Sequence, residues 1–198
     1  MSAARLTAAG STLLVIDVQE KLLAAIPPAP VLLLNVGFLI DAAGRLDVPV
    51  LATEQYPKGL GPTHPAIAWR LPAERPAKVE FSCAAVPAKT GRHFGHGRGT
   101  VLLAGMETHV CVLQTALDLL DSGLTVFVAA DAVAARSAAD HELALRRMER
   151  AGAVLTTAEA AAFEWLGTAA APQFKAVSAL VQERMRRLRE LTPPGTPA

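Results

Sequence analysis

One cysteine stands where a buried strand is expected to lead into a helix. Cys111 follows the apolar run 101–104 and Gly105, and it falls in the first turns of a helix predicted over 108–122. Unpaired backbone N–H groups and the dipole at a helix N-terminus favour a thiolate, so the pKa of Cys111 is a candidate for lowering. Such a thiol is a nucleophile; the alternative is a small buried hydrophobic residue, the usual state of a free cysteine.

Two further reactive side chains are expected at the same end of the fold. Asp17 closes a strand predicted over 12–17, and Lys78 lies in a weaker strand over 76–80. Ligands of open parallel sheets bind beyond the carboxyl ends of the strands, where Asp17, Lys78 and Cys111 would meet. Asp17 could instead cap a turn, and Lys78 could be an ordinary exposed lysine. His109 is a poor base for Cys111, because side chains two residues apart on a helix diverge, and we expect it to cap or pack.

Apolar runs alternate with helical patterns along the chain. Strands are predicted over 12–17, 48–53, 76–80, 100–104, 124–129 and 154–156. Helices are predicted over 31–46, 108–122 and 172–191, and capping boxes at 137–140 and 156–159 predict two more. This alternation indicates a parallel sheet covered on both faces. The expected fold class is α/β: a three-layer α/β/α fold with a six-stranded, mainly parallel, Rossmann-like sheet.

The pattern shows neither an internal repeat nor a linker between domains. We therefore expect a single domain over 1–198, with a core over 11–175 and a C-terminal helix and tail over 172–198. The end of that helix is basic, and we interpret it as a solvated end favoured by the helix dipole, not as a nucleic-acid patch. The arginines concerned are Arg184, Arg186, Arg187 and Arg189.

The composition argues against several classes of function. Of 198 residues, 52% are hydrophobic, and 19 Lys and Arg against 18 Asp and Glu leave a net charge of +1. This balance predicts no basic face for nucleic acid, and no apolar run reaches the roughly 18 residues that a membrane span needs. No secretory signal is visible, and two cysteines form neither a disulfide framework nor a zinc site, which favours a reducing cytoplasm.

Four short segments together resemble a known family. They are Asp17-Val-Gln19, Thr53-Glu-Gln-Tyr56, Lys78-Val-Glu-Phe-Ser82 and Gly105-Met-Glu-Thr-His-Val-Cys111. In this order and spacing the sequence resembles the isochorismatase-like cysteine hydrolases from about residue 13 to 174. Segment 54–61 and the Glu-Thr-His-Val-Cys segment are most similar to the subgroup called isochorismatase domain-containing proteins.

The resemblance implies a mechanism and its residues. Cys111 would be the nucleophile, Asp17 would take and return its proton, and Lys78 would hold the ion pair. Backbone N–H groups of Glu107 and Cys111 would form the oxyanion hole, placed by a cis peptide bond before Glu107. The implied function is hydrolysis of a small amide-like C–N bond through a thioester-type intermediate, without a cofactor. Members are commonly oligomeric, so we expect a homo-oligomer with a small-molecule substrate.

The chain departs from two branches of the superfamily. Nicotinamidases carry an Asp-x-His metal pattern where this chain has Thr53-Glu54-Gln55-Tyr56, and true isochorismatases do not use the cysteine nucleophile. We therefore predict no catalytic metal, and neither nicotinamide nor isochorismate as substrate. The predicted pocket residues are Gln19, Glu54, Gln55, Tyr56, Phe81 and Met106, whereas for Trp69 we favour core packing. Glu54 could instead form a salt bridge to a loop or neighbouring chain.

Two alternatives stay open at this point. The chain could be a redox-sensing or scaffold protein on the same fold with Cys111 as a sensor thiol, or a hydrolase of an ester or vinyl ether. The glycine-rich segment 91–99 interrupts a helix that the family usually places there, and it could affect pocket closure or an oligomer contact. His93 and His96 in that segment are more typical of a flexible polar loop than of a metal site.

Overall fold

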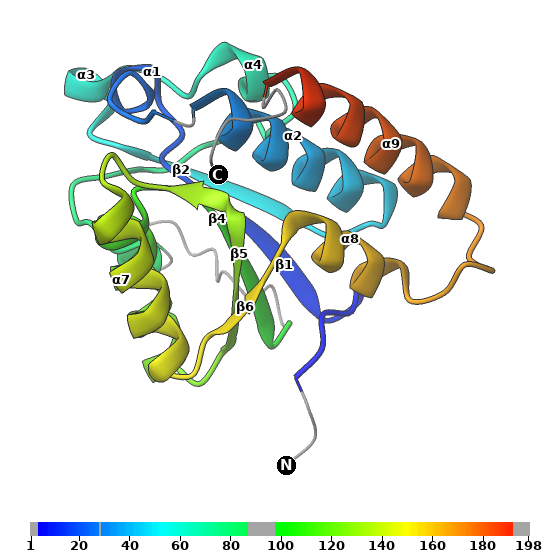
Figure 1. Ribbon diagram of the computed structural model, residues 1–198. Coiled ribbons are helices and arrows are strands. Elements are labelled where there is room, and N and C mark those ends of the chain that lie inside the picture. Colours follow the sequence, from blue (N-terminus) through cyan, green and yellow to red (C-terminus); the bar gives the residue numbers. More distant parts are fainter. Residues whose placement is uncertain (1–3, 28, 87–97, 192–198) are drawn as a thin grey trace.

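The chain folds around a single six-stranded sheet (Figure 1). A computed structural model describes residues 4–27, 29–86 and 98–191. The strand order is β3-β2-β1-β4-β5-β6, and every pairing is parallel. The strands are β1 (Ser11–Ile16), β2 (Val50–Gln55), β3 (Ala77–Lys78), β4 (Thr100–Met106), β5 (Thr125–Ala134) and β6 (Val154–Thr156). The predicted fold class is confirmed, with a wholly parallel sheet.

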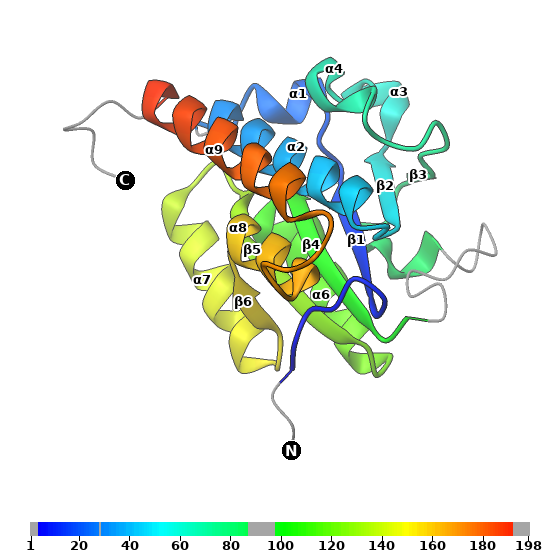
Figure 2. The same cartoon turned by 90° about the vertical axis from the view of Figure 1, so that its right-hand side faces the viewer.

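Helices cover both faces of this sheet, which gives the three layers. One layer holds α2 (Ala29–Arg45), α8 (Ala158–Leu166) and α9 (Phe174–Leu191), packed against one another (Figure 2). The other holds the π-helix η2 (Thr108–Val112), α6 (Leu113–Asp121) and α7 (Ala138–Arg150). The short helices α1 (Glu20–Leu23), α3 (Pro57–Leu60) and α4 (Pro65–Ala68) follow β1 and β2, and the 3-10 turn η1 (Cys83–Ala85) follows β3.

The central strands are buried because their apolar side chains face helices on both sides. All six residues of β1 and six of the seven in β4 are buried. Such strands read as continuous apolar runs instead of alternating ones. Alternate residues of a strand point to opposite faces of the sheet, and each face has its own hydrophobic core. Leu13 and Val15 therefore pack toward α2, and Leu14 and Ile16 toward α6. Among the described residues, no helix is both long and apolar enough to cross a bilayer.

Several element boundaries differ from the predictions. The second strand begins and ends two residues later, and the helix predicted over 108–122 divides into η2 and α6. The capping prediction at Ser137 is confirmed, because its side chain accepts a hydrogen bond from the Asp140 N–H. The prediction at Thr156 is wrong by one residue: Thr157 caps α8 by accepting from the Ala160 N–H. Thr156 instead ends β6, since pairing with β5 continues to that residue.

The interpretation of the C-terminal arginines is wrong for Arg184. This residue is only 8% exposed, and its guanidinium donates to Asp131 at 2.7 Å, Glu159 at 3.1 Å and Asn35 at 2.8 Å. Asp131 also accepts from the Ala158 N–H at 2.7 Å. Arg184 therefore connects α9 to α2, β5 and α8. The sequence does not distinguish it from the three exposed arginines that follow it.

Candidate active site

The strand order of the sheet reverses at β1 and β4. These neighbours lie at the reversal of a 3-2-1-4-5-6 sheet, the position where open α/β sheets bind ligands. Asp17 follows β1 directly, and Cys111 lies in η2, which begins two residues after β4. Lys78 ends β3, two strands from β1. The sheet thus brings to one edge three residues that are separated by up to 94 positions in the sequence.

The backbone at this edge is unusual. Asp17 adopts a left-handed conformation with φ 52°, as does Tyr56 at φ 36° after β2. Gly105 has φ 118°, and a Cβ at this position would lie 2.1 Å from the carbonyl oxygen of Ile16. Only glycine allows β4 to approach the end of β1 so closely. Left-handed non-glycine residues concentrate at functional sites, which is consistent with a site here.

Asp17 and Lys78 form a buried ion pair. The Lys78 ammonium donates to Asp17 Oδ2 at 2.6 Å, and neither side chain is more than 1% exposed. Burial raises the pKa of Asp17 although the charge of Lys78 opposes this shift. Burial would lower the pKa of Lys78, but the attraction of Asp17, together with the smaller contributions of Cys83 and Cys111, raises it overall and keeps the lysine charged. The pair is therefore an anion and a cation held out of water, and burial increases the affinity of the carboxylate for a proton.

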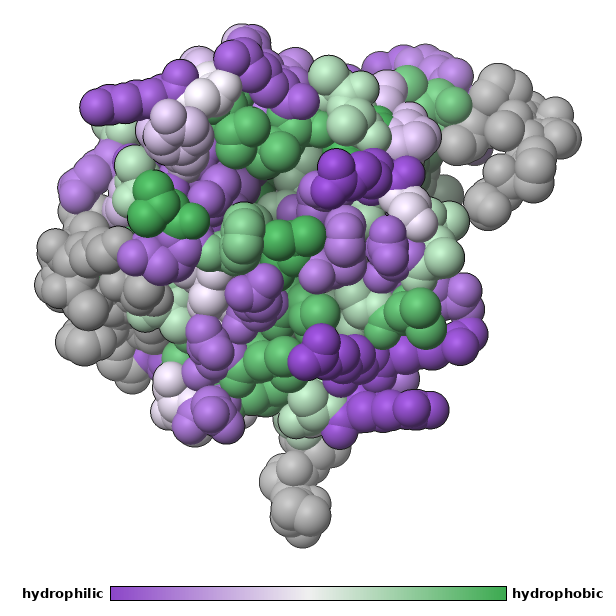
Figure 3. Space-filling model, turned by 90° about the vertical axis from the view of Figure 1, so that its left-hand side faces the viewer, coloured by the Kyte–Doolittle hydropathy of each residue, from purple (hydrophilic) through white to green (hydrophobic). Residues whose placement is uncertain are grey.

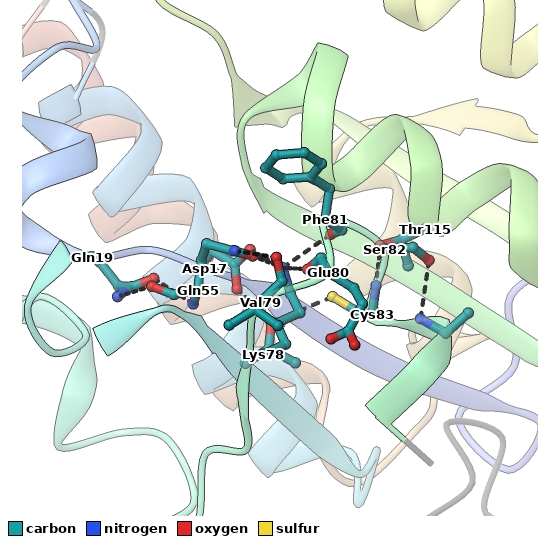
Figure 4. Close-up of polar contacts among 12 residues, drawn as sticks. Asp17, Gln19, Gln55, Lys78, Val79, Glu80, Phe81, Ser82, Cys83 and Thr115 are labelled. Carbon is teal, nitrogen blue, oxygen red and sulfur yellow. Dashed lines mark hydrogen bonds and ion pairs between the residues drawn. The ribbon is translucent and has the colours of Figure 1, made fainter. Parts of the chain in front are cut away.

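Two glutamines and two carbonyls hold this pair in place (Figure 4). Lys78 also donates to Gln55 Oε1 at 2.7 Å, to the Phe81 carbonyl at 3.0 Å and to the Glu80 carbonyl at 3.3 Å. Gln19 in turn binds the backbone of Gln55, donating to its carbonyl at 3.0 Å and accepting from its N–H at 2.7 Å. Gln19 and Gln55, predicted as pocket residues, thus support the lysine and use their own polar groups on protein partners.

Cys111 completes the cluster from η2. Its side chain is 5% exposed, and its thiol is hydrogen-bonded to the Asp17 carboxylate. Burial raises the pKa of Cys111, and the negative charge of Asp17 raises it further, while Lys78 opposes both. The expected lowering of this pKa is therefore wrong for the resting protein. Burial and the carboxylate together act more strongly on the pKa of the thiol than the lysine does, so Cys111 rests as a neutral thiol.

The peptide between Met106 and Glu107 is cis, as the resemblance implied. Glu107 precedes η2 in an extended conformation, with its side chain paired to Arg136 at 3.2 Å. The N–H groups of Glu107 and Cys111 remain the predicted oxyanion donors, and both residues lie in the segment that carries the thiol. His109 lies beside α7, with its Nε2 3.9 Å from Asp140 Oδ2, which fits the predicted packing role.

Three residues join the site that the sequence did not single out. Thr53 donates its hydroxyl hydrogen to Asp17 Oδ1 at 2.8 Å and lies 3.4 Å from the sulfur of Cys83. Cys83 in turn donates its N–H to the hydroxyl of Thr115 at 2.9 Å. Thr53 and Gln55 alternate on one face of β2, so period-two reasoning could have found Thr53. No sequence signal pointed to Cys83 or Thr115.

Three predicted pocket residues do not join the cluster. Glu54 points to the other face of β2, where its carboxylate accepts from Thr63 at 2.7 Å and pairs with Arg75 at 3.3 Å. The alternative prediction for Glu54 was a salt bridge to a loop or a neighbouring chain, and the structure shows such a salt bridge within the chain. Met106 is fully buried in the core beside α2, because alternation along β4 turns it away from Cys111. Phe81 is 52% exposed, and its ring points away from the ion pair (Figure 4).

The surface next to Lys78 is hollowed. Tyr56, Pro57, Lys58, Ala77, Lys78 and Val79 line a depression of about 320 Å³. Tyr56 is thus a wall of this depression and is 52% exposed. A larger hollow of about 500 Å³ lies among α2, α4 and α9, in the opposite helix layer from Cys111, and it contains none of the cluster. The prediction for Trp69 is wrong: it is 73% exposed and stacks on Arg70.

No group of three or more His, Cys, Asp or Glu side chains among the described residues is arranged to hold a metal ion. His64 accepts a hydrogen bond from the Ala66 N–H at the start of α4. His141 contacts Thr108 at 2.9 Å, and burial lowers its pKa. His93, His96 and most of the 91–99 segment lie outside the described residues, so the predictions for that loop stay predictions.

A doubly wound parallel sheet with a thiol, a carboxylate and a lysine at its reversal point defines the class: an α/β protein with a candidate active site at the carboxyl ends of its strands. Comparison with known proteins then identifies the family. The model described as "Isochorismatase domain" matches residues 11–160, and the chain belongs to this family. The predicted family is thus confirmed.

Relatives and solved structures agree with this assignment. Isochorismatase domain-containing protein 2A of Mus musculus is 40% identical over 184 residues, which are 92% of this chain and 87% of the relative. A Caenorhabditis elegans structure described as MAR1 ribonuclease is 39% identical with a TM-score of 0.83, covering 98% of both chains. The YcaC gene product of Escherichia coli, described as an octameric hydrolase of unknown specificity, is 25% identical with a TM-score of 0.84, covering 96% of both.

Proposed function

We propose that the protein is a cysteine-dependent hydrolase of a small amide-like C–N bond. The observation that carries this proposal is the neutral thiol of Cys111 hydrogen-bonded to a buried carboxylate, Asp17, that is itself paired with Lys78. A nucleophile, a base and a group that orients the base are the parts needed for covalent catalysis. Family membership supports hydrolysis as the type of reaction.

The raised pKa values assign the proton transfers. As the sulfur of Cys111 bonds to the substrate carbon, its proton passes to Asp17, whose burial raises its pKa and so favours accepting it. The N–H groups of Glu107 and Cys111 hold the negative oxygen. When the C–N bond breaks, Asp17 returns the proton to the leaving nitrogen. A water molecule then attacks the thioester, gives a proton to Asp17, and releases the acid, after which Asp17 reprotonates Cys111.

Lys78 keeps Asp17 oriented throughout this cycle. Its ammonium stays charged next to the carboxylate, and Gln55 and the Phe81 carbonyl fix its position. Substrate would enter by the depression beside Lys78, with Tyr56 as one wall.

The test is acylation of Cys111 by a panel of small primary amides, esters and vinyl ethers, followed by intact-protein mass spectrometry. We expect a covalent adduct on Cys111 with at least one amide, complete loss of the adduct and of turnover in Cys111→Ala, and unchanged folding by circular dichroism. Turnover that survives in Cys111→Ala would refute the proposal. Adducts formed only by esters or vinyl ethers would support Cys111 as the nucleophile but would contradict an amide-like C–N bond as its target.

Two other outcomes are distinguishable in the same screen. Reversible oxidation of Cys111 by peroxide, with no turnover of any compound, would favour the sensor alternative. The C. elegans neighbour is described as a ribonuclease, so a single-stranded RNA is included as a competing substrate. RNA cleavage that persists in Cys111→Ala would establish an activity outside this site, against the expectation from the net charge of +1.

We also propose that the protein forms a homo-oligomer in the cytoplasm. The face on the α7 and α3 side of Figure 1 carries hydrophobic residues in its middle, bordered by hydrophilic ones (Figure 3). Leu143 of α7 is 61% exposed, and the E. coli neighbour is octameric. Light scattering after size-exclusion chromatography should give a mass that is a multiple of 20.7 kDa; a monomer at micromolar concentration would contradict this.

A further inference from the structure

A chain of neutral hydrogen-bonding groups runs from Asp17 into the core. Its first link is the Thr53 hydroxyl, 2.8 Å from Asp17 Oδ1, and its second is the sulfur of Cys83, 3.4 Å from the same hydroxyl. Thr115 is the third, hydrogen-bonded to the Cys83 side chain and accepting the Cys83 N–H at 2.9 Å. Thr53 is 2% exposed and the other two are fully buried, so these groups are held away from water.

The chain has a defined direction in the resting protein. An ionised carboxylate only accepts hydrogen bonds, so the Thr53 hydroxyl must donate to Asp17. The Thr53 oxygen is then left to accept, and Cys83 can supply the S–H because burial raises the pKa of its thiol to about 11. The hydrogens therefore point from Cys83 to Thr53 to Asp17.

Protonation of Asp17 reverses the direction in which these hydrogen bonds must point. Oδ2 is held 2.6 Å from the Lys78 ammonium, which carries donors and no acceptor. Oδ1 faces a hydroxyl that can donate or accept. Thr53 is thus the partner able to accept a hydrogen bond from the protonated carboxyl, and it would then donate its own hydrogen to the sulfur of Cys83. Either atom of the Thr53–Cys83 contact can be the donor.

We propose that Thr53 and Cys83 are positioning residues that form a reversible hydrogen-bond relay serving Asp17 in both of its protonation states. Rotation of the Thr53 hydroxyl and the Cys83 S–H, which can turn to Thr115, reverses the chain without making or breaking any covalent bond. The relay rests on the proposed function, in which Asp17 takes a proton from Cys111. It keeps the carboxyl in one orientation while its charge changes, with no solvent reorganisation.

The groups that act on Asp17 come from four elements. Lys78 of β3 opposes protonation, and the thiols of Cys111 in η2 and Cys83 in η1 interact with the same carboxylate. Thr53 of β2 is the fourth, through its hydrogen bond. A test must therefore remove the charge of Asp17 while Lys78 stays in place, and must read the response at Cys83.

Infrared spectroscopy of the Cys83 S–H stretch meets this need. In a Cys111→Ala background the full chain holds one thiol, so the S–H band belongs to Cys83 alone. Asp17→Asn in that background replaces the carboxylate by a neutral group that can donate to Thr53. We expect the band to shift on this change, and to shift in the same direction when Asp17 is protonated by lowering the pH.

Variants of Thr53 then test the path. Thr53→Val, which has no hydroxyl, should abolish the response of the band, and Thr53→Ser should restore it. A band that ignores the state of Asp17, or that responds equally in Thr53→Val, would overturn the relay; if Thr53→Val does not fold, the Asp17→Asn and Thr53→Ser arms decide. Because the background lacks the nucleophile, this result is independent of Cys111 acylation, so failure of the relay and failure of the proposed function are separate outcomes.

Discussion

Two ion networks in the described part of the chain, one around Arg184 and one at Asp17 and Lys78, differ in how far they are removed from water. Arg184 binds two carboxylates, and both keep solvent contact, with side chains 27% exposed for Asp131 and 38% for Glu159. Asp17 and Lys78 are both almost completely buried. Each network joins several elements around the sheet. Only the second has a thiol, that of Cys111, hydrogen-bonded to its carboxylate.

This difference separates a structural network from a reactive one. The carboxylates bound by Arg184 keep contact with solvent, and an arginine stays protonated in proteins, so this network is not arranged for proton transfer. At Asp17, burial raises the pKa of the base, and the same carboxylate raises the pKa of Cys111. The proton of Cys111 thus lies beside a base whose burial increases its affinity for a proton.

The largest effect is expected for Lys78→Met. It leaves Asp17 charged and buried without its partner, which typically costs about 3–5 kcal/mol in the free energy of unfolding. It also removes the charge that opposes the raised pKa of Cys111, so alkylation of Cys111 by iodoacetamide should slow. Urea unfolding and mass spectrometry measure the two effects, with the exposed Lys175→Met as the matched control. A stable variant with normal Cys111 reactivity would contradict the assignment of Lys78.

Asp17→Asn should change the same alkylation rate in the opposite direction. The negative charge that raises the Cys111 pKa disappears while Lys78 remains, so the thiolate should form at lower pH. We expect alkylation at pH 7.5 to rise about tenfold, which corresponds to a fall of roughly one unit in this pKa, while turnover is lost with the base. The exposed Asp118→Asn is the control. Slower alkylation would show that Asp17 activates the thiol at rest.

Arg184→Met tests the structural network. It leaves Asp131 and Glu159 unpaired, but their solvent contact limits the cost, so we expect a loss of about 3 kcal/mol in unfolding free energy. Cys111 alkylation should be unchanged, because Arg184 lies in the opposite helix layer. Arg187→Met on the same helix is exposed, and it should change stability by less than about 0.5 kcal/mol. Altered Cys111 reactivity in Arg184→Met would show that the two networks are coupled.

The same contrast explains what the sequence could predict. Asp17, Lys78 and Cys111 each follow or end a strand, so the rule that sites lie at carboxyl strand ends brought them together. Arg184 was missed because its partners, Asn35, Asp131 and Glu159, lie 25 to 149 residues away in the sequence and follow no local pattern. Local sequence patterns predict strands, helices and their ends, but they do not predict contacts between residues that are far apart in the sequence.

The pKa of Cys111 was misjudged for a related reason. A helix N-terminus is visible in sequence and favours a thiolate. Burial and the hydrogen bond to Asp17 depend on packing, and they raise the pKa instead. Glu54 and Gln55 show the same limit: the motif placed both at the site, but strand alternation sends only Gln55 to Lys78. Which face a strand turns to the site depends on its register with its neighbours, set by contacts across the sheet.

The smallest effect is expected at Cys83 and appears only at high pH. Burial raises the pKa of this thiol from 9.0 to about 11, so its ionisation is easier in the unfolded chain than in the folded one. Its contribution to stability is complete below pH 9 and is lost as the pH rises through 11, by about 2 kcal/mol. Cys83→Ser does not titrate there, so its unfolding free energy should fall less steeply between pH 8.5 and 11 when both proteins are unfolded in urea with reductant. Parallel slopes would show that the Cys83 thiol ionises as easily in the core as in the unfolded chain, and the resting direction of the relay from Cys83 to Asp17 would then be lost.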